Sequence, residues 1–173
     1  MSANKTRWSD LVDEDIDYFT GPPLTDEMID HAQKKLGYKL PDAYIDLLRY
    51  KNGCSFIRNC FPTDVPTNWS ETHFVIEGIS GIGGEDGIDS DTGSDYMIKE
   101  WGYPPVGIAF GQCPSAGHET VMFDYSECGK DGEPAVIYVD MESDTLRKGL
   151  RIADNFESFL SQLTDESDYP DEE

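Results

Sequence analysis

Residues 36–53 read LGYKLPDAYIDLLRYKNG, and their order describes the end of one helix and the whole of the next. Gly37 is typical of the residue that follows a helix, because glycine adopts the left-handed backbone conformation required there. Pro41 stands where the first turn of a new helix is expected, and Asn52-Gly53 ends that helix. Its apolar positions fall on one face: Tyr44, Leu47 and Leu48. The stretch predicts two helices joined by a short turn.

Upstream of this stretch the pattern is also helical. Thr25 is placed as an N-cap, followed by the acids that a first helical turn favours, so a helix is expected over residues 26–36. Its apolar stripe consists of Met28, Ile29, Ala32 and Leu36. Residues 8–19 predict a further amphipathic helix through the spacing of Trp8, Leu11, Val12, Ile16 and Phe19.

Downstream the chain changes from helical patterns to short strands. Residues 78–94 are rich in Gly, Asp and Ser, which excludes long regular structure. Strands are expected at residues 73–76, 106–110, 120–125 and 135–139, and the turn-rich segment between the last two predicts an antiparallel hairpin. The order is helices, then strands, then a closing helix, without βαβ repeats. It predicts an α+β fold whose largely antiparallel sheet is flanked by helices.

Two short helices complete the prediction. One, over residues 95–101, is expected to bury Tyr96, Met97 and Trp101. The closing helix has Asp154 and Glu157 in capping-box positions. Its apolar residues follow at helical spacing: Phe156, Phe159, Leu160 and Leu163.

The length of 173 residues suits one domain, which we place at residues 8–164. Residues 1–7 are expected to be a flexible N-terminus. Residues 165–173 carry six acids and no base, which is typical of a disordered acidic tail. No secretory signal and no apolar run of membrane-spanning length occurs, so a cytoplasmic location is expected.

The charge is strongly one-sided. Thirteen basic against thirty-five acidic residues give a net charge of −22, which disfavours nucleic acid and anionic membranes as partners. Residues 59–98 contain eight acids and neither Lys nor Arg. This stretch is either a solvated, solubilising surface or a face built for a basic partner, and composition alone leaves both open.

Three kinds of chemistry find only weak support. Cys113, His118 and Asp124 have the residue types of a thiol catalytic set, but they match no local signature. The acids of residues 85–95 lack the ligand spacing of a calcium loop, and the four cysteines lack zinc spacing. Gly81–Gly84 is not followed by the Lys-Ser/Thr of a phosphate loop. We therefore predict no catalytic residues, no metal and no cofactor.

Three blocks together are similar to the SUKH superfamily, which includes bacterial immunity proteins and the yeast cell-wall assembly regulators. The first is the opening stretch, residues 36–53. The second is residues 101–110, WGYPPVGIAF, and the third runs from Cys113 to Asp140 through the predicted hairpin. The resemblance implies one SUKH-like α+β domain with a cleft for partner binding. For many bacterial members it also implies immunity against toxins.

The candidate partner-binding residues come from the acid-only stretch, from aromatic residues and from the first strand of the hairpin. They are Trp69, Glu85, Asp86, Asp89, Asp91, Trp101, His118, Glu119, Asp124 and Tyr125. Period-2 alternation places Glu119 and Tyr125 on one face of the strand, and His118 and Asp124 on the other. Asp124 either lines a cleft or is a turn carboxylate, and the sequence does not separate these alternatives.

These observations predict a non-catalytic protein that binds a protein partner stoichiometrically. The expected partner is a basic toxin domain that the chain neutralises. The alternative is a regulatory or scaffolding domain with a non-toxin partner, and a metal-dependent or thiol enzyme is a third class. The oligomeric state does not follow from the sequence.

Overall fold

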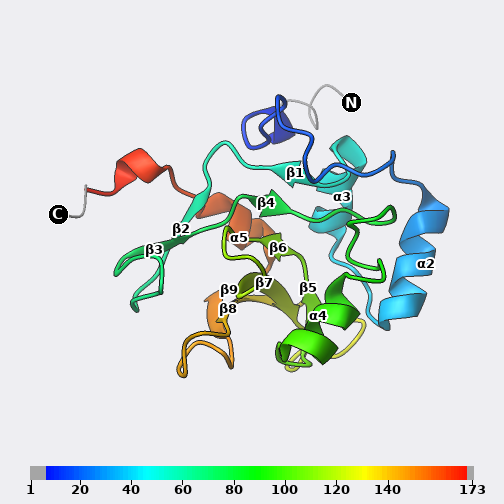
Figure 1. Cartoon of the computed structure of the whole chain (residues 1–173). Coiled ribbons are helices and arrows are strands. Elements are labelled where there is room, and N and C mark those ends of the chain that lie inside the picture. The colour runs from blue at the N-terminus through cyan, green and yellow to red at the C-terminus, as the bar shows by residue number, and fades with distance from the viewer. Residues whose placement is uncertain (1–6, 171–173) are drawn as a thin grey trace.

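The two helices of the opening stretch form as the sequence predicts (Figure 1). The computed structural model describes residues 7–170, so the expected flexible N-terminus lies outside the described residues except for its last position. Helix α2, Asp26–Leu36, is capped by Thr25, whose hydroxyl accepts from the Met28 amide, and Gly37 ends it with a φ of 83°. Helix α3, Asp42–Tyr50, starts one residue later than expected, with Pro41 at the N-cap position.

The strands within residues 7–170 form three antiparallel sheets. A four-stranded sheet has the order β5 (Gly107–Ala109), β7 (Glu119–Asp124), β8 (Ala135–Asp140) and β9 (Leu150–Ala153). A three-stranded sheet has the order β1 (Cys54–Ser55), β4 (Gly78–Ile79) and β6 (Gly111–Gln112), and β2 (Cys60–Pro62) pairs with β3 (His73–Val75). The β7–β8 hairpin is confirmed, with Val121 opposite Tyr138. The α+β class with a largely antiparallel sheet is therefore correct.

The four-stranded sheet is covered on both faces. Val121 and Phe123 point into the main core, with α3 and the closing helix α5, Phe156–Ser161, while Met122 belongs to a smaller cluster on the opposite face. That smaller cluster packs against helix α4, Ser94–Trp101. The alternation of the strand thus directs successive side chains into two different cores.

Tyr44 joins helix α3 to both the core and the chain beyond β4. It is fully buried, and its ring meets Phe110, Phe123 and Phe156 edge to face, with centroids 5.2–5.8 Å apart. Its hydroxyl donates to the Ser80 carbonyl at 2.6 Å. Aromatic edge-to-face contacts and a satisfied buried hydroxyl both stabilise the fold.

The expected helix over residues 8–19 is wrong. Only residues 7–9 of the described chain are helical there, and most of the following residues form turns. Residues 11–13 pair with residues 55–57 instead of continuing the helix. The Leu11 carbonyl accepts from Ile57, and Val12 forms a bridge with Phe56. Leu11 and Val12 are buried as expected, whereas Ile16 is 41 % exposed.

Three further details, in α4, in α5 and in the C-terminal segment, differ from prediction. In α4, Tyr96 and Trp101 are exposed rather than buried, because that short helix covers the sheet mainly through Met97 and Ile98. Asn155, not Asp154, caps α5 by accepting from Ser158. Within the segment predicted as a disordered tail, Glu166–Asp168 forms the 3₁₀ helix η1, and Tyr169 stacks on His73 with ring centroids 3.8 Å apart.

The Tyr44 hydroxyl gives a test of this packing. We expect Tyr44→Phe to lower the free energy of unfolding by about 1–2 kcal/mol, because the buried Ser80 carbonyl loses its donor while the ring contacts remain. Urea unfolding followed by fluorescence measures this difference. Tyr96→Phe makes the same chemical change at an exposed position and should stay within about 0.5 kcal/mol of the parent. Equal effects of the two substitutions would contradict the assigned role of Tyr44.

Candidate functional site

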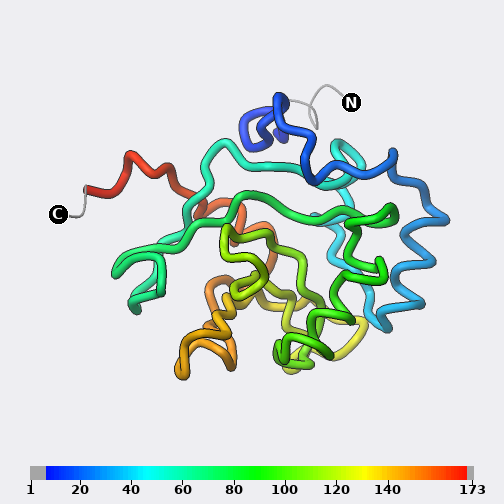
Figure 2. The backbone as a smooth tube through the Cα atoms, in the orientation of Figure 1, coloured from blue at the N-terminus to red at the C-terminus, as the bar shows by residue number. Residues whose placement is uncertain are grey.

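Asn52 fixes the glycine-rich segment that follows β4. Its side chain is 3 % exposed; its Nδ2 donates to the Pro22 carbonyl at 2.6 Å and to the Ile82 carbonyl at 2.8 Å. Its Oδ1 accepts from the Ile82 amide at 2.8 Å. The tube view shows the green segment, residues 80–94, folding back between α2 and the strands β4 and β6 (Figure 2). One amide side chain therefore ties three distant segments together.

The close approach at Asn52 demands glycine at the next position. Gly53 has a φ of 93°, and a Cβ there would lie 2.0 Å from the Phe19 carbonyl oxygen. A larger residue would be strained by its backbone conformation and would also push residues 19–22 away. The Asn-Gly pair lies beyond the end of α3, whose C-cap is Lys51 rather than the expected Asn52-Gly53, and it has a structural function in positioning this segment.

Asp89 fixes the same segment from within. It is 8 % exposed, its carboxylate accepts from the Gly83 amide at 2.8 Å, and its carbonyl accepts from the Lys35 ammonium. The prediction that Asp89 belongs to an exposed acidic surface is therefore corrected, because its carboxylate is used to close the loop. Glu85, Asp86 and Asp91 of the same segment are exposed.

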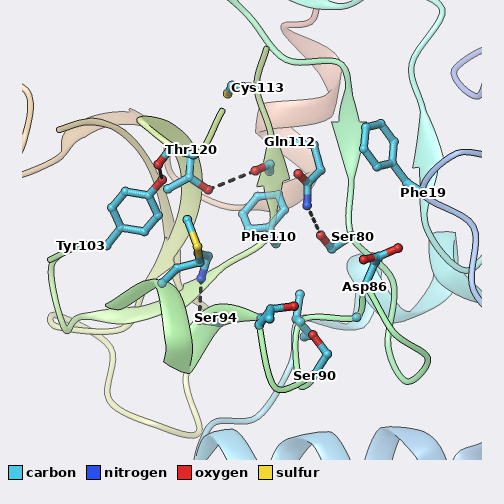
Figure 3. Close-up of a pocket in the computed structure, with 18 of the residues that line it drawn as sticks. Phe19, Ser80, Asp86, Ser90, Ser94, Tyr103, Phe110, Gln112, Cys113 and Thr120 are labelled. Carbon is cyan, nitrogen blue, oxygen red and sulfur yellow. Dashed lines mark hydrogen bonds between the residues drawn. The ribbon is translucent and has the colours of Figure 1, made fainter. Parts of the chain in front are cut away.

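The fixed segment forms one wall of a cavity of about 270 Å³. Residues 18–19, β6 and the chain from Cys113 to Thr120 form other parts of the wall. Figure 3 shows Tyr103 and Phe19 on opposite sides of the cavity, with Ser80, Gln112 and Thr120 between them. Hydrogen bonds hold this wall: Gln112 donates to Ser80 Oγ, Thr120 to the Gly111 carbonyl, and Tyr103 to the Gly117 carbonyl.

A second cavity of about 270 Å³ adjoins the first along the glycine-rich segment. The two share Phe19, Asp86 and Gly87 in their walls. Glu85 borders the second cavity and Glu119 the first, and among residues 7–170 no Lys, Arg or His lines either wall. We call these adjoining cavities, with their walls, the acidic groove. The negative charge of its walls favours the binding of a positively charged group.

Glu119 is the buried charge of the acidic groove. It stands at the start of β7 opposite Asp140 of β8, and its Oε2 accepts from the Tyr138 hydroxyl at 2.6 Å. Burial raises the pKa of Glu119; Asp140 and Glu142 raise it further, while Tyr138 and His118 oppose the shift. Burial also raises the pKa of Asp140. Two carboxyl groups thus lie close together in surroundings that disfavour their charge.

The structure brings some predicted partner-binding residues together beside the acidic groove. Trp101 and His118 meet edge to face at 5.5 Å between ring centroids, and Gly117, which lines the groove, lies against Trp101. His118 also lies 3.7 Å from Glu142. Trp101 is 37 % exposed and so is available at the rim.

The other predicted residues lie elsewhere. Trp69 is exposed in the β2–β3 connection, away from the groove wall. Tyr125 is 3 % exposed, stacks on Tyr38 and donates to the Lys39 carbonyl, so its prediction as a partner-binding residue is corrected. Asp124 accepts from the Ser126 amide at 2.9 Å, which supports the alternative of a turn carboxylate.

The structure does not assemble the thiol catalytic set. His118 precedes β7 and Asp124 ends it, so the two lie six positions apart along an extended strand, or roughly 20 Å. Burial, followed by the nearby Glu119, raises the pKa of the Cys113 thiol well above its usual value, which disfavours the reactive thiolate. In residues 7–170, no three His, Cys, Asp or Glu side chains are grouped so that they could hold a metal ion.

Comparison with known proteins settles the family. The model of the SMI1/KNR4 family (SUKH-1) matches residues 23–162, which is most of the chain. The chain belongs to the SMI1/KNR4 family. No curated protein and no solved structure matches it. Of the helices in the described part of the chain, none combines the length and hydrophobicity of a membrane span.

The matched region of this SMI1/KNR4 member contains most of the acidic groove, but sequence patterns did not identify its wall. The unpredicted wall residues are mostly small and polar, and they come from separate segments: Ser80, Ser90, Ser94, Gln112 and Thr120. The only sequence signal is indirect, namely a glycine-rich stretch without Lys or Arg between two strands. Such a stretch indicates a loop, and the hydrogen bonds of Asn52 and Asp89 fix the conformation of that loop.

The buried carboxylate predicts an unusual pH dependence. Folding raises the pKa of Glu119 above its ordinary 4.5. Protonation of Glu119 therefore stabilises the folded state below pH 4.5, and this contribution is lost as the pH rises through the folded-state pKa. We expect Glu119→Gln to be more stable than the parent at pH 7, and this difference to vanish below about pH 4.5.

Urea unfolding at a series of pH values measures this difference. Glu100→Gln, which removes an exposed carboxylate of α4, is the matched control and should show little pH-dependent difference. A Glu119→Gln variant that loses stability at pH 7 would contradict the burial argument.

Proposed function

We propose that this SMI1/KNR4 member is a non-catalytic cytoplasmic protein that binds a basic protein partner one to one through the acidic groove. We propose further that the partner is a toxin domain and that the chain acts as its immunity protein. The observation that carries the proposal is the charge of the groove: Glu85, Asp86 and Glu119 border its two adjoining cavities, and no basic residue of the described chain lines either wall. A positive partner surface is complementary to this arrangement.

The rim of the groove offers anchors beside the charge. Tyr18 lines the first cavity and is 82 % exposed, and Trp101 lies against Gly117 of its wall. Exposed aromatic residues next to a cavity are favoured hot spots of protein interfaces, since they bury a large area at small cost in side-chain entropy. These two residues replace Tyr125 as the expected anchors.

A binding function agrees with the chemistry of the groove. The SMI1/KNR4 family is generally non-catalytic, and the Cys113 thiol is poorly suited to act as a nucleophile. Two hydroxyl groups of the wall, those of Thr120 and Tyr103, donate to backbone carbonyls of neighbouring segments. Fixed polar groups of this kind favour recognition by shape and hydrogen bonding.

Binding kinetics against the product of the neighbouring gene, at low and at physiological salt, test the proposal. We expect Glu85→Lys with Asp91→Lys to slow association by roughly tenfold at low salt and to flatten its salt dependence, because exposed charges steer encounter. Both residues are exposed, so the fold should survive.

The matched control is Asp131→Lys with Asp144→Lys, which makes the same change in net charge at exposed positions outside both cavity walls. It should alter association much less. Equal slowing by both pairs would show that net charge, rather than the groove, is responsible. Tight binding to a partner without toxicity would favour the regulatory alternative.

A further inference from the structure

Trp69 is an exposed tryptophan that lies away from both walls of the acidic groove. Its side chain is 46 % exposed in the β2–β3 connection, residues 63–72. Val65 and Pro66 of the same connection are also exposed. An exposed tryptophan keeps a large apolar area in water, and tryptophan is among the residues most enriched at the hot spots of protein interfaces. The tip of this connection therefore has the composition of a contact surface.

Hydrogen bonds within the connection hold Trp69 in place. The Thr67 hydroxyl accepts from the Trp69 amide at 3.2 Å and from the Ser70 amide at 3.1 Å. The same hydroxyl donates to the His73 carbonyl at 2.9 Å, and the Thr67 amide donates to the Ser70 carbonyl at 2.8 Å. Local bonds from a side chain to the backbone fix the conformation of a turn. Because the connection is ordered in the free protein, binding through it avoids much of the entropy cost of immobilising a loop.

The surroundings of this tip are acidic. Asp64 and Glu71 of the connection are exposed, and the connection contains neither Lys nor Arg. The 3₁₀ helix η1, which carries two further exposed acids, is held beside β3 by the stacking of Tyr169 on His73. A partner surface that receives the tip is therefore complementary if it is apolar where it meets the tryptophan and basic around it.

The same charges argue against two other occupants. A second copy of this chain would place its own acids against these, and each chain carries a net charge of −22, so the two surfaces would repel each other. Tryptophan is common at lipid interfaces, but an anionic membrane surface repels exposed carboxylates. A basic protein surface is the occupant that the charges favour.

The connection also adjoins the surroundings of the acidic groove. The Asn68 amide, next to Trp69, opposes the burial-driven rise in the pKa of Asp140, so it lies close to that carboxylate. Asp140 in turn lies opposite Glu119, which borders the first cavity. In Figure 1 the β2–β3 connection, the β8–β9 connection and α4 lie along the lower side of the molecule. One partner can therefore cover the groove and also reach Trp69.

We propose that the β2–β3 connection is a second, preorganised contact of the partner-binding surface, and that Trp69 enters an apolar pocket with a basic rim on the partner. This inference rests on the proposed function, because it concerns the same basic partner. It separates two roles: the charges of the acidic groove act on the rate of association, whereas Trp69 acts on the rate of dissociation.

Binding kinetics of the parent and of Trp69→Ala against the product of the neighbouring gene test this contact. We expect the dissociation rate of Trp69→Ala to rise at least about tenfold, with association changed less than about twofold, because a buried aromatic anchor acts on the bound state. Ile57→Ala truncates a side chain that is 49 % exposed and belongs to neither surface, and it should leave both rates unchanged. Equal dissociation of the parent and Trp69→Ala would overturn the inference.

Two substitutions at Thr67 test the preorganisation. Thr67→Ala removes the hydroxyl that holds the Trp69 amide, whereas Thr67→Ser keeps it. Backbone order parameters of the free parent should be about 0.85 across residues 63–72 and should fall in Thr67→Ala. Dissociation of Thr67→Ala from the partner should be at least about threefold faster, and Thr67→Ser should match the parent in both measurements. Order parameters below about 0.6 in the parent would overturn the preorganised contact.

The outcomes separate this inference from the proposed function. If the partner binds the parent and Trp69→Ala equally well, the inference fails while binding through the groove stands. If Trp69→Ala dissociates faster but Glu85→Lys with Asp91→Lys leaves association unchanged, the Trp69 contact stands and the groove proposal fails. Absence of binding overturns both.

Two further measurements check the choice of occupant. Sedimentation of the parent should show no self-association that Trp69→Ala abolishes, and vesicles of phosphatidylcholine with phosphatidylserine should not bind the parent. Self-association through Trp69 would make a second copy the occupant, and vesicle binding lost in Trp69→Ala would make it a membrane. Either result would overturn the assignment of a basic protein pocket.

Discussion

The acidic groove depends on the hydrogen bonds of one buried amide, Asn52. Its side-chain oxygen accepts from the Ile82 amide, and its side-chain nitrogen donates to the carbonyls of Ile82 and Pro22. Its backbone carbonyl accepts from the Gly21 amide at 2.7 Å. Aspartate lacks the donors for this pattern, and smaller residues lack the reach. A glycine-rich segment that would otherwise be mobile is thereby held in one conformation and can serve as a binding wall.

The groove concentrates negative charge at a cost in stability. Glu119 and Asp140 face each other across β7 and β8, and burial disfavours the charged form of both. Selection for stability alone would favour a neutral residue in place of one of these two carboxylates. Binding sites commonly retain such destabilising groups. The proposed function thus assigns recognition to the loops that line the acidic groove, while the sheets and helices support them.

The sequence predicted those elements whose signals are local. Caps and apolar periodicity identified α2, α3 and the apolar face of α5, and alternation with a turn-rich loop identified the β7–β8 hairpin. Residues 8–19 have helical spacing, but pairing of Leu11 and Val12 with residues 56–57 overrides it. The groove could not be predicted, since its wall joins residues 18–19, 80–94 and 109–120 through tertiary contacts. For the same reason the sequence could not show that Asp89 and Tyr125 are buried.

Amide hydrogen exchange of the complex tests most directly whether the acidic groove is the partner-binding surface. The measurement compares the free protein with the protein bound to the product of the neighbouring gene. Binding in the acidic groove should increase protection in residues 80–94 and 109–120, with little change in the β7–β8 connection, residues 126–134. Protection confined to that connection or to the β2–β3 connection around Trp69, with exchange in residues 80–94 unchanged, would contradict it.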